Sequence, residues 1–302
     1  MDSRRQTTAA FAILLAISLT LSVVMVRYVD RARGDATLQD VMYIPSATAL
    51  KRMSLGYSGL LADIYWTRAV QYFGGKHHEH SKEYLLLAPL LDITTTLDPH
   101  LLPAYEFGSI FLSQKPPEGA GDPKAAADLV LRGIRENPEA WRLWYHLGFI
   151  YYQEMNDPKR ASEAFLEGSK VPGAHPWMKI MAAALAQHAG EAQTAWYLWS
   201  NILNSTKDPA IRANAVNRLR ALQVDRDVPA LQEFVDRVAQ QTGHVPATFR
   251  QLVAGGWMKR IPIDPLGNPY QLRDGHVEVA DPEGLPFITK GLPPGVKASD
   301  KP

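Results

Sequence analysis

Residues 77–80, with the sequence His-His-Glu-His, are the side chains of this chain that most resemble a metal site. Imidazole and carboxylate groups are common zinc ligands, so the cluster could hold an ion that activates water for hydrolysis. The H-E-x-x-H spacing of metalloprotease helices is absent. Adjacent side chains on a loop rarely converge on one ion, and polar runs are usually solvated surface. We therefore expect a solvated loop here rather than the site of a metal-dependent hydrolase.

Other patterns that support catalysis are incomplete. Gly56-Tyr57-Ser58-Gly59 lacks one residue of the G-x-S-x-G nucleophile elbow. Asp264 and Asn268 could offer oxygens to calcium, but hydrogen bonds within a turn explain both residues without an ion. The chain has no cysteine, which excludes thiolate ligands and thiol nucleophiles, and it has no glycine-rich phosphate loop. We predict no catalytic residue, no metal ion, no cofactor and no small-molecule substrate, and hence no enzyme.

The overall composition describes a chain that can bury a sizeable core. Of its 302 residues, 46% are hydrophobic and 21% are charged. The formal net charge of +1 gives no general attraction to nucleic acid. No stripe of Lys and Arg with interleaved aromatic residues is present either, so we do not expect nucleic-acid binding.

The amino-terminal part contains an uncharged, apolar run of 20 residues, from Thr7 to Val26. As a helix this run would be about 30 Å long, which matches the hydrocarbon core of a bilayer. A cleavable signal peptide is the alternative, but Arg and Asp follow the run where a small-x-small cleavage site would lie. We predict that residues 1–34 form a single-pass transmembrane anchor with its flanks. A short tail before a long downstream domain favours an extracytoplasmic, periplasmic position for the bulk of the chain.

Residues 35–80 are predicted to be a connector and capping helices. The segment from Ala47 to Phe73 is apolar and aromatic, and Gly56 and Gly59 are expected to divide it into two helical pieces. One interpretation places this segment against the membrane surface as an interfacial helix. The favoured interpretation makes it the cap of a helical array.

A pair of helices is the clearest pattern in the middle of the chain. Trp144, Leu147, Gly148 and Tyr151 are spaced at i, i+3, i+4 and i+7, so they share one helix face. On the next helix, a second face is formed by Ala161, Phe165 and Gly168. The small residues let the two backbones approach, and the aromatic rings fill the space beside them. Such a hairpin cannot bury its face alone and has to stack on neighbours.

Prolines 34 residues apart, Pro138 and Pro172, bound this hairpin. The pattern W-x2-L-G-x2-Y…A-x3-F…P resembles the tetratricopeptide repeat family. The resemblance covers roughly Lys82 to Leu222, and we predict a tetratricopeptide-like α-solenoid of helical hairpins over residues 81–241. Its helices are expected at 82–97, from Asp122-Pro123, at 177–188, at 192–203, from Asp208-Pro209 to 222, and separately at 228–241.

The resemblance also implies a binding groove, because the family binds peptides or protein domains along the first helix of each hairpin. By position, the groove residues are Arg142, Tyr145, Phe149 and Tyr152 in the clearest hairpin, and Tyr105, Ser109 and Leu112 in the preceding one. Rigid aromatic side chains give contact area at little entropic cost, and Arg142 can bind a carboxylate. Two alternatives stay open: the groove is vacant, or it receives the chain's own segment Leu50–Phe73.

Residues 242–285 change in character and are predicted to form a small cap. The run Pro262-Ile-Asp-Pro-Leu-Gly-Asn-Pro-Tyr270 resembles the carboxyl-terminal part of the major pseudopilins of type II secretion, over about 30 residues. Two short strands are expected around Asp274-Gly275, which is a strong hairpin signal. Residues 286–302 are predicted to be a flexible tail. The apolar run lacks the glutamate that pseudopilins carry just inside their amino-terminal helix.

The sequence thus predicts a mainly helical protein with a transmembrane helix, helical repeats and a small α+β cap. The function that follows is a membrane-anchored scaffold for protein–protein interaction in a bacterial cell envelope, with a protein or peptide partner in the groove. The alternative is an assembly factor or structural component of a machine like those of type II secretion or type IV pili.

Overall fold

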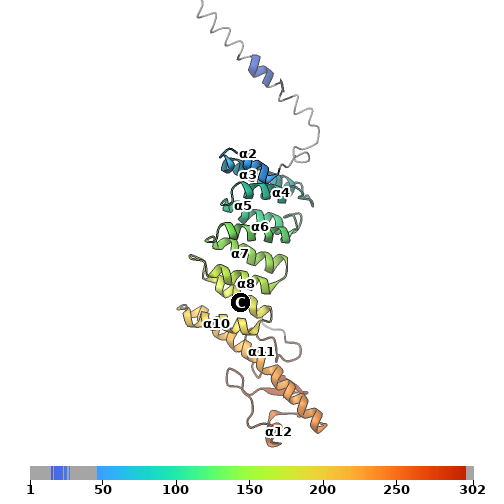
Figure 1. Ribbon diagram of the computed structural model, residues 1–302. Coiled ribbons are helices and arrows are strands. Elements are labelled where there is room, and N and C mark those ends of the chain that lie inside the picture. The colour runs from blue at the N-terminus through green and yellow to red at the C-terminus, as the bar shows by residue number, and fades with distance from the viewer. Residues whose placement is uncertain (1–14, 16, 23, 26, 28–45, 297–302) are drawn as a thin grey trace, which may run out of the picture. The chain divides into compact units, whose positions relative to one another are not determined.

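The computed structural model describes residues 15, 17–22, 24, 25, 27 and 46–296 of the chain. Over these residues the fold is mainly helical, with one two-stranded antiparallel sheet (Figure 1), which confirms the predicted fold class at this level. The chain divides into two compact units, residues 1–98 and residues 99–302, and each is described by itself.

In the part of the chain that the structure describes, no helix combines the length and apolar character that crossing a bilayer requires. The predicted anchor, residues 7–26, falls largely outside the described residues. The anchor therefore stays a prediction.

Residues 46–98 of the first unit fold into α2 (Ala47–Met53), α3 (Ser58–His78) and α4 (Leu87–Leu97). The predicted break near Gly56 and Gly59 is confirmed, since α2 ends before these glycines and α3 begins at Ser58. Both α2 and α3 pack against α4, which is buried over most of its length. The inward face of α3 is formed by side chains three or four residues apart, namely Ala62, Tyr65, Ala69 and Tyr72.

Two predictions about this unit are wrong. The helix expected from Lys82 begins only at Leu87, because the Ser81 hydroxyl accepts the Glu83 backbone N–H and holds a turn there. The predicted loop at residues 77–80 is half helical, since α3 continues to His78. Basic side chains in the last turn of a helix interact favourably with its dipole, which accounts for the extension.

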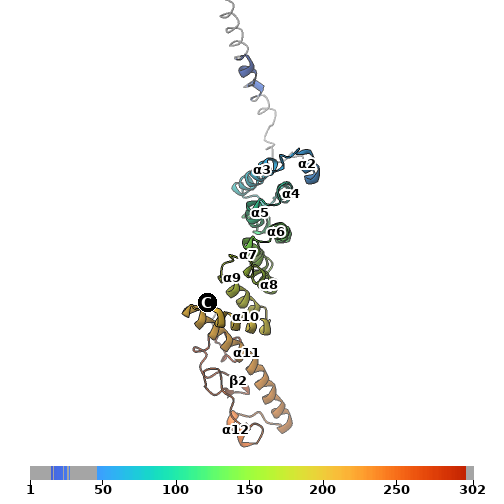
Figure 2. The ribbon, with the colours of Figure 1, turned by 60° about the vertical axis from the view of Figure 1, so that its left-hand side comes forward.

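The second unit begins with helices that pack against one another in sequence order (Figures 1 and 2). They are α5 (Leu102–Ser113), α6 (Pro123–Glu136), α7 (Trp141–Phe149), α8 (Pro158–Ser169), α9 (Trp177–His188) and α10 (Ala192–Ser205). A π-helical turn, η1 (Ile150–Glu154), continues α7. Contact is not limited to sequence neighbours, because α5 also packs against α7. The helices thus form a continuous stack within this unit.

Aspartate–proline pairs start three helices of the second unit. The carboxylates of Asp122, Asp157 and Asp208 each accept backbone N–H groups of the first turn, in α6, α8 and α11 respectively. Proline follows at the first helical position, where its missing N–H costs nothing. The helix starts predicted at Asp122-Pro123 and Asp208-Pro209 are confirmed.

Glycines set the closest approaches between these helices. A Cβ added to Gly148 of α7 would lie 2.6 Å from the Phe165 ring of α8. A Cβ on Gly168 would lie 2.4 Å from Trp144, and one on Gly133 would lie 2.7 Å from Tyr105. Each aromatic ring therefore occupies space that only glycine leaves open, as the sequence predicts for Gly148.

The two helices predicted from Pro209 to Leu222 and from Val228 to Gln241 are one helix, α11 (Pro209–Thr242), with Pro229 inside it. A proline inside a helix costs about 3 kcal/mol or more, through one lost hydrogen bond and a clash. The helix continues because both of its halves are buried. Ala215 and Leu222 belong to the core of the helical stack, whereas Val224 and Val235 belong to the core of the carboxyl-terminal cap.

The cap packs on the second half of α11 and contains α12 (Phe249–Ala254), β1 (Gln271–Arg273) and β2 (His276–Glu278). The strands pair Leu272 with Val277, and Asp274 and Gly275 turn between them with φ values of +50° and +82°, which confirms the predicted hairpin. The loop 262–270 closes on Asp264, whose Oδ1 accepts the backbone N–H groups of Leu266 and Asn268. Hydrogen bonding within the turn therefore accounts for Asp264.

The predicted flexible tail is wrong for its first residues. Ile288 is buried in the cap, and the backbone N–H groups of Thr289 and Lys290 both donate to the Asp225 carboxylate of α11. The prediction of a flexible tail follows from the proline and glycine residues of this segment, which signal turns. The segment is held against α11 by buried Ile288 and by Asp225, which is more than 60 residues away in the sequence. Residues 297–302 lie outside the described residues.

Replacing Gly148 with alanine should destabilise the stack by about 1–3 kcal/mol, because the new methyl group would overlap the Phe165 ring. Gly74→Ala in α3 is the matched control, since no atom lies within 4 Å of the added Cβ. Alanine in a helix interior stabilises by roughly 0.5–1 kcal/mol relative to glycine. Hydrogen exchange resolved by segment should show faster exchange in α7 and α8 only for Gly148→Ala. Equal protection in both variants would contradict the packing described.

Candidate functional site

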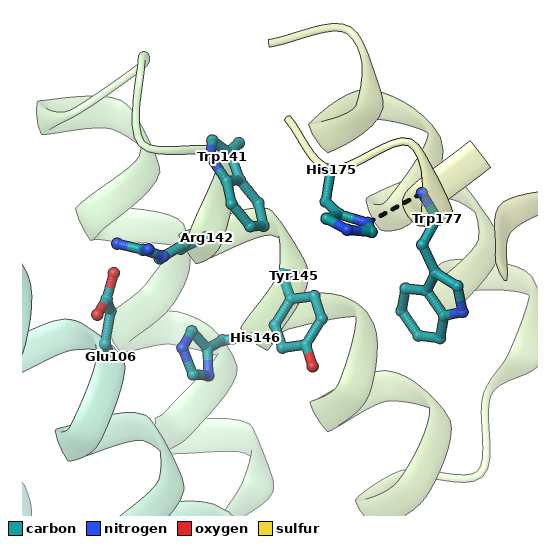
Figure 3. A pocket seen from close by; sticks show the side chains of 7 residues that line it. All are labelled: Glu106, Trp141, Arg142, Tyr145, His146, His175 and Trp177. Carbon is teal, nitrogen blue, oxygen red and sulfur yellow. Dashed lines mark hydrogen bonds between the residues drawn. The ribbon is translucent and has the colours of Figure 1, made fainter. Parts of the chain in front are cut away.

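A pocket of about 520 Å³ opens on the second unit beside α7 (Figure 3). It is lined by Glu106, Trp141, Arg142, Tyr145, His146, His175 and Trp177. The volume is in the range of pockets that bind one or a few side chains or a small molecule. Its lining combines three aromatic side chains with two histidines and one charge of each sign.

Three helices in the stack supply these residues. Glu106 comes from α5, four lining residues come from α7, and Trp177 is the first residue of α9, with His175 just before it. Because α5, α7 and α9 are each the first helix of a hairpin, the pocket follows one edge of the stack. Trp141 is the first residue of α7 and Trp177 is the first residue of α9, so two consecutive hairpins carry an indole at the equivalent position.

Tyr145 lies at the centre of the pocket and is held by other rings. Its ring is 4.8 Å from that of Phe149 and 6.2 Å from those of Phe165 and Trp177, measured between centroids. Phe149 and Trp177 stack at 6.0 Å with an interplanar angle of 15°. Edge-to-face and offset contacts of this kind favour one arrangement of rings over others. The floor of the pocket is therefore preorganised for contact with an apolar group.

The polar groups lie at the sides. Figure 3 shows the Glu106 carboxylate and the Arg142 guanidinium facing each other on the side opposite Trp177. Arg142 is exposed and lies 5.5 Å from the centroid of the Trp141 ring, which holds its guanidinium at the rim. His175 Nδ1 accepts the backbone N–H of Trp177 at 3.2 Å, so that ring is fixed at the other rim.

His146 is the lining residue whose protonation the site controls. Burial and, after it, the positive charge of Arg142 lower the pKa of His146 from its usual 6.5. Its ring meets the Tyr145 ring edge-on at 5.7 Å. At neutral pH His146 is therefore an uncharged hydrogen-bonding group beside the aromatic floor.

A second pocket of about 480 Å³ begins where the first one ends. His175 lines both pockets, and the second continues past Lys179 of α9 to Lys207 and Asp208 at the start of α11. A ligand that fills both would lie along the hairpin edge and meet two lysines beyond the aromatic pocket. This continuity suits an extended chain better than a single compact molecule.

The structure brings together part of the predicted groove. Arg142 and Tyr145 line the pocket, and Phe149 supports it from below through its contacts with Tyr145 and Trp177. Tyr152 is exposed but does not line it. The π-helical turn that contains Tyr152 changes the register after α7 by one residue, so Tyr152, seven residues after Tyr145, no longer shares its face.

The other three predicted groove residues are core residues, and this corrects the expectation. Tyr105, Ser109 and Leu112 are buried, and the Tyr105 ring packs over Gly133 of α6. In α5 the residue that faces the pocket is Glu106, the one after Tyr105. Glu106 lies 40 residues before His146, just as Tyr105 lies 40 residues before Tyr145, so the spacing between the two hairpins is kept. The expectation fails because Tyr105 packs inward against Gly133 and leaves Glu106 at the pocket.

Sequence reasoning missed Glu106, Trp141, His146, His175 and Trp177. A signal for two of them was present: Trp141 and Trp177 are 36 residues apart, and each begins the first helix of a hairpin. Glu106, His146 and His175 reach the pocket because of the way neighbouring helices pack. The spacing of apolar residues along the sequence does not predict that packing.

The side chains of residues 77–80 are not arranged around a common point. Within residues 46–296 and the few described before them, no three His, Asp or Glu side chains are placed to hold a metal ion together. The half-buried Lys76 and the exposed Glu79 form an ion pair at 3.7 Å that includes one residue of the cluster.

Comparisons of the chain with protein-family profiles, with curated protein sequences and with solved structures gave no match. The function proposed below therefore rests on the geometry of the pocket.

Lowering the pH should cost folding stability through His146. Its folded pKa lies below the unfolded value of 6.5, so the unfolded chain takes up the proton first. The contribution of His146 is complete above pH 6.5 and decreases as the pH falls below it. The difference in unfolding free energy between wild type and His146→Gln should therefore change with pH below 6.5 and be constant above it.

An NMR titration of the His146 ring measures the pKa itself. A midpoint below 6.5 is expected, with a smaller displacement in Arg142→Gln, because burial is the larger cause and the Arg142 charge the smaller one. A midpoint above 6.5 in the wild type would contradict the environment described for this ring.

Proposed function

We propose that the protein is a membrane-anchored scaffold of the tetratricopeptide type, which binds an extended segment of a partner protein along the pocket edge of its helical stack. The observation that carries the proposal is the origin of the pocket: the first helices of three consecutive hairpins each contribute lining residues. A repeat array that presents equivalent helices side by side produces an extended binding surface of this kind.

The chemistry of the lining defines the segment. Tyr145, Trp141 and Trp177 accept an aromatic or aliphatic side chain, and such rings are the residues that dominate binding energy at protein interfaces. Arg142 is placed at the rim to bind a carboxylate beside that side chain. The lysines of the adjoining pocket favour further acidic residues along the same segment. The partner is therefore an acidic segment with an apolar anchor residue.

The alternative that the chain fills its own groove is disfavoured by the first unit. The inward face of α3 from Ala62 to Tyr72 is already buried within residues 46–98. These side chains are therefore not available to fill the groove, and the exposed apolar side chains of the same segment, such as Leu55 and Tyr57, are not among the residues that line the pocket. The proposed occupant is accordingly a separate protein.

The membrane and envelope parts of the proposal rest on the sequence. The apolar run 7–26 is long enough to anchor the chain, and the bulk of the protein is proposed to lie on the periplasmic side. Anchoring would keep the pocket close to the membrane and raise its effective concentration toward partners held there.

Peptide selection tests the pocket directly. The full chain in detergent should select, from a phage-displayed random peptide library, peptides with an acidic residue next to an aromatic or aliphatic one. Arg142→Ala and Trp141→Ala should weaken binding of a selected peptide by roughly 10–30-fold each, the usual cost of removing a central interface residue. Fluorescence anisotropy of the labelled peptide measures the affinity.

Matched controls exist on the same unit. Arg135 of α6 and Trp196 of α10 are exposed and do not line the pocket, so Arg135→Ala and Trp196→Ala should leave the affinity unchanged. Equal losses in the pocket and control variants would overturn the assignment of the binding surface.

Replacing Glu106 with glutamine should strengthen the binding of an acidic peptide. Glu106 faces Arg142, so its negative charge repels a ligand carboxylate that approaches the guanidinium, and glutamine removes that repulsion. An increase of about 2–10-fold is expected at low salt, decreasing as salt screens the charges. Peptides whose acidic residue is changed to an amide should not respond. Weaker binding of the acidic peptide to Glu106→Gln would show that the carboxylate does not bind at Arg142.

A further inference from the structure

Five large apolar side chains are exposed together where α2 joins α3. Their exposed fractions are 76% for Met53, 87% for Leu55, 70% for Tyr57, 59% for Leu60 and 41% for Ile64. Met53 is the last residue of α2, Leu55 and Tyr57 lie in the turn that follows, and Leu60 and Ile64 are four residues apart on one face of α3. Isolated exposed apolar residues are common, but a contiguous group indicates a surface that something covers. We name this group the α2–α3 tip; Figure 2 labels the two helices that flank it.

The backbone of the tip is fixed in a form that suits a polar residue better than the leucine it carries. Leu55 has a φ of +49°, in the left-handed region that L-residues other than Asn and Asp rarely adopt, and Gly56 follows at +93°. Hydrogen bonds hold the turn: Tyr57 N–H donates to the Ser54 carbonyl at 2.8 Å, and the Ser54 hydroxyl donates to the Lys51 carbonyl at 2.7 Å. The left-handed conformation is unfavourable for leucine, and the exposed side chain is unfavourably hydrated. Contact with an apolar environment would remove the second cost.

Charge around the tip favours a surface with negative groups. No acidic residue occurs between Asp40 and Asp63, whereas Lys51 and Arg52 lie in the last turn of α2 and are exposed. The Lys51 ammonium donates to the Thr96 carbonyl of α4 at 2.8 Å, so its charge is held beside the tip. Apolar side chains flanked by cations, with an interfacial tyrosine, are the composition that binds the headgroup region of an anionic bilayer.

The chain length before the tip allows this contact. Twenty residues, 27–46, separate the apolar run 7–26 from α2. Fully extended, a segment of that length spans at most about 70 Å. A tip joined to a membrane-held run through such a connector stays within reach of the same bilayer.

We propose that the α2–α3 tip inserts into the headgroup region of the bilayer, as a second membrane contact beside the anchor. The inserted part is short, because the face of α3 that carries Leu60 and Ile64 continues with Thr67 and Gln71 and becomes polar. This inference rests on the anchor in the proposed function and adds to it a fixed attachment of the first unit at the lipid surface.

Single-cysteine labelling tests the insertion, because the natural chain has no cysteine. Full chains with Leu55→Cys, or with Val245→Cys as the exposed control in the cap, carry an environment-sensitive dye and are reconstituted into phosphatidylcholine vesicles with and without phosphatidylglycerol. Vesicles with brominated acyl chains should quench the dye at position 55 and leave the dye at position 245 unquenched. The quenching at position 55 should be stronger with phosphatidylglycerol.

A second variant separates insertion from folding. Asparagine tolerates the left-handed conformation, so Leu55→Asn keeps the turn and removes the apolar group. With the dye at Tyr57→Cys, this substitution should lower the ratio of inserted to free tip roughly tenfold or more, the effect expected from transferring one leucine side chain. The thermal midpoint should be unchanged or higher. Unchanged quenching in Leu55→Asn would overturn the proposal.

The remaining outcomes are distinct. A chain that is held in vesicles but leaves position 55 unquenched would overturn the insertion and keep the anchor. A dye at position 55 that is shielded from aqueous iodide yet not quenched by brominated lipid would show that protein covers the tip, which also overturns the insertion. A chain that does not associate with vesicles at all would overturn both.

Discussion

The close approach of neighbouring helices at Gly133, Gly148 and Gly168 determines the geometry of the rest of the helical stack. At each glycine an aromatic side chain of a neighbouring helix lies where a Cβ would otherwise be. The ring of Phe165 over Gly148 is also part of the cluster with Tyr145, Phe149 and Trp177 that supports the pocket. The shape of the pocket therefore depends on the spacing between α7 and α8, because moving these helices apart would separate the rings that hold Tyr145 in place.

The long helix α11 links this stack to the cap. Its first half contributes to the core that contains Trp199, and its second half contributes to the core that contains Tyr270 and the small sheet. Asp225, near its middle, accepts the backbone N–H groups of residues 289 and 290 and so holds the end of the described chain on the helix. Burial raises the pKa of the Tyr270 hydroxyl well above its usual value, with smaller contributions from Asp227 and Asp264, so this ring stays neutral in the cap core. A single continuous helix thus contributes to both cores.

The sequence predicted the helical elements better than it predicted their faces. Asp-Pro pairs and glycines at helix contacts are local signals with a direct physical cause, and the structure places them as expected at Asp122 and Gly148. The groove residues predicted in α5 are wrong, because Tyr105 packs against Gly133 of α6 and Glu106 lines the pocket instead. Which of two adjacent residues faces inward depends on the neighbouring helix, and the spacing of the pattern does not contain that information. The π-helical turn at Tyr152 and the uninterrupted helix across Pro229 depend on tertiary burial, which local patterns do not contain.

The central claim is that the edge formed by α5, α7 and α9 is a docking surface for an extended protein segment. A crystal structure of the protein with a library-selected peptide tests it most directly. The account predicts an apolar peptide side chain against Tyr145 and Trp177, a peptide carboxylate at Arg142, and a chain that runs past His175 toward Lys179. A peptide bound on another face, with the pocket between Trp141 and Trp177 empty, would contradict it.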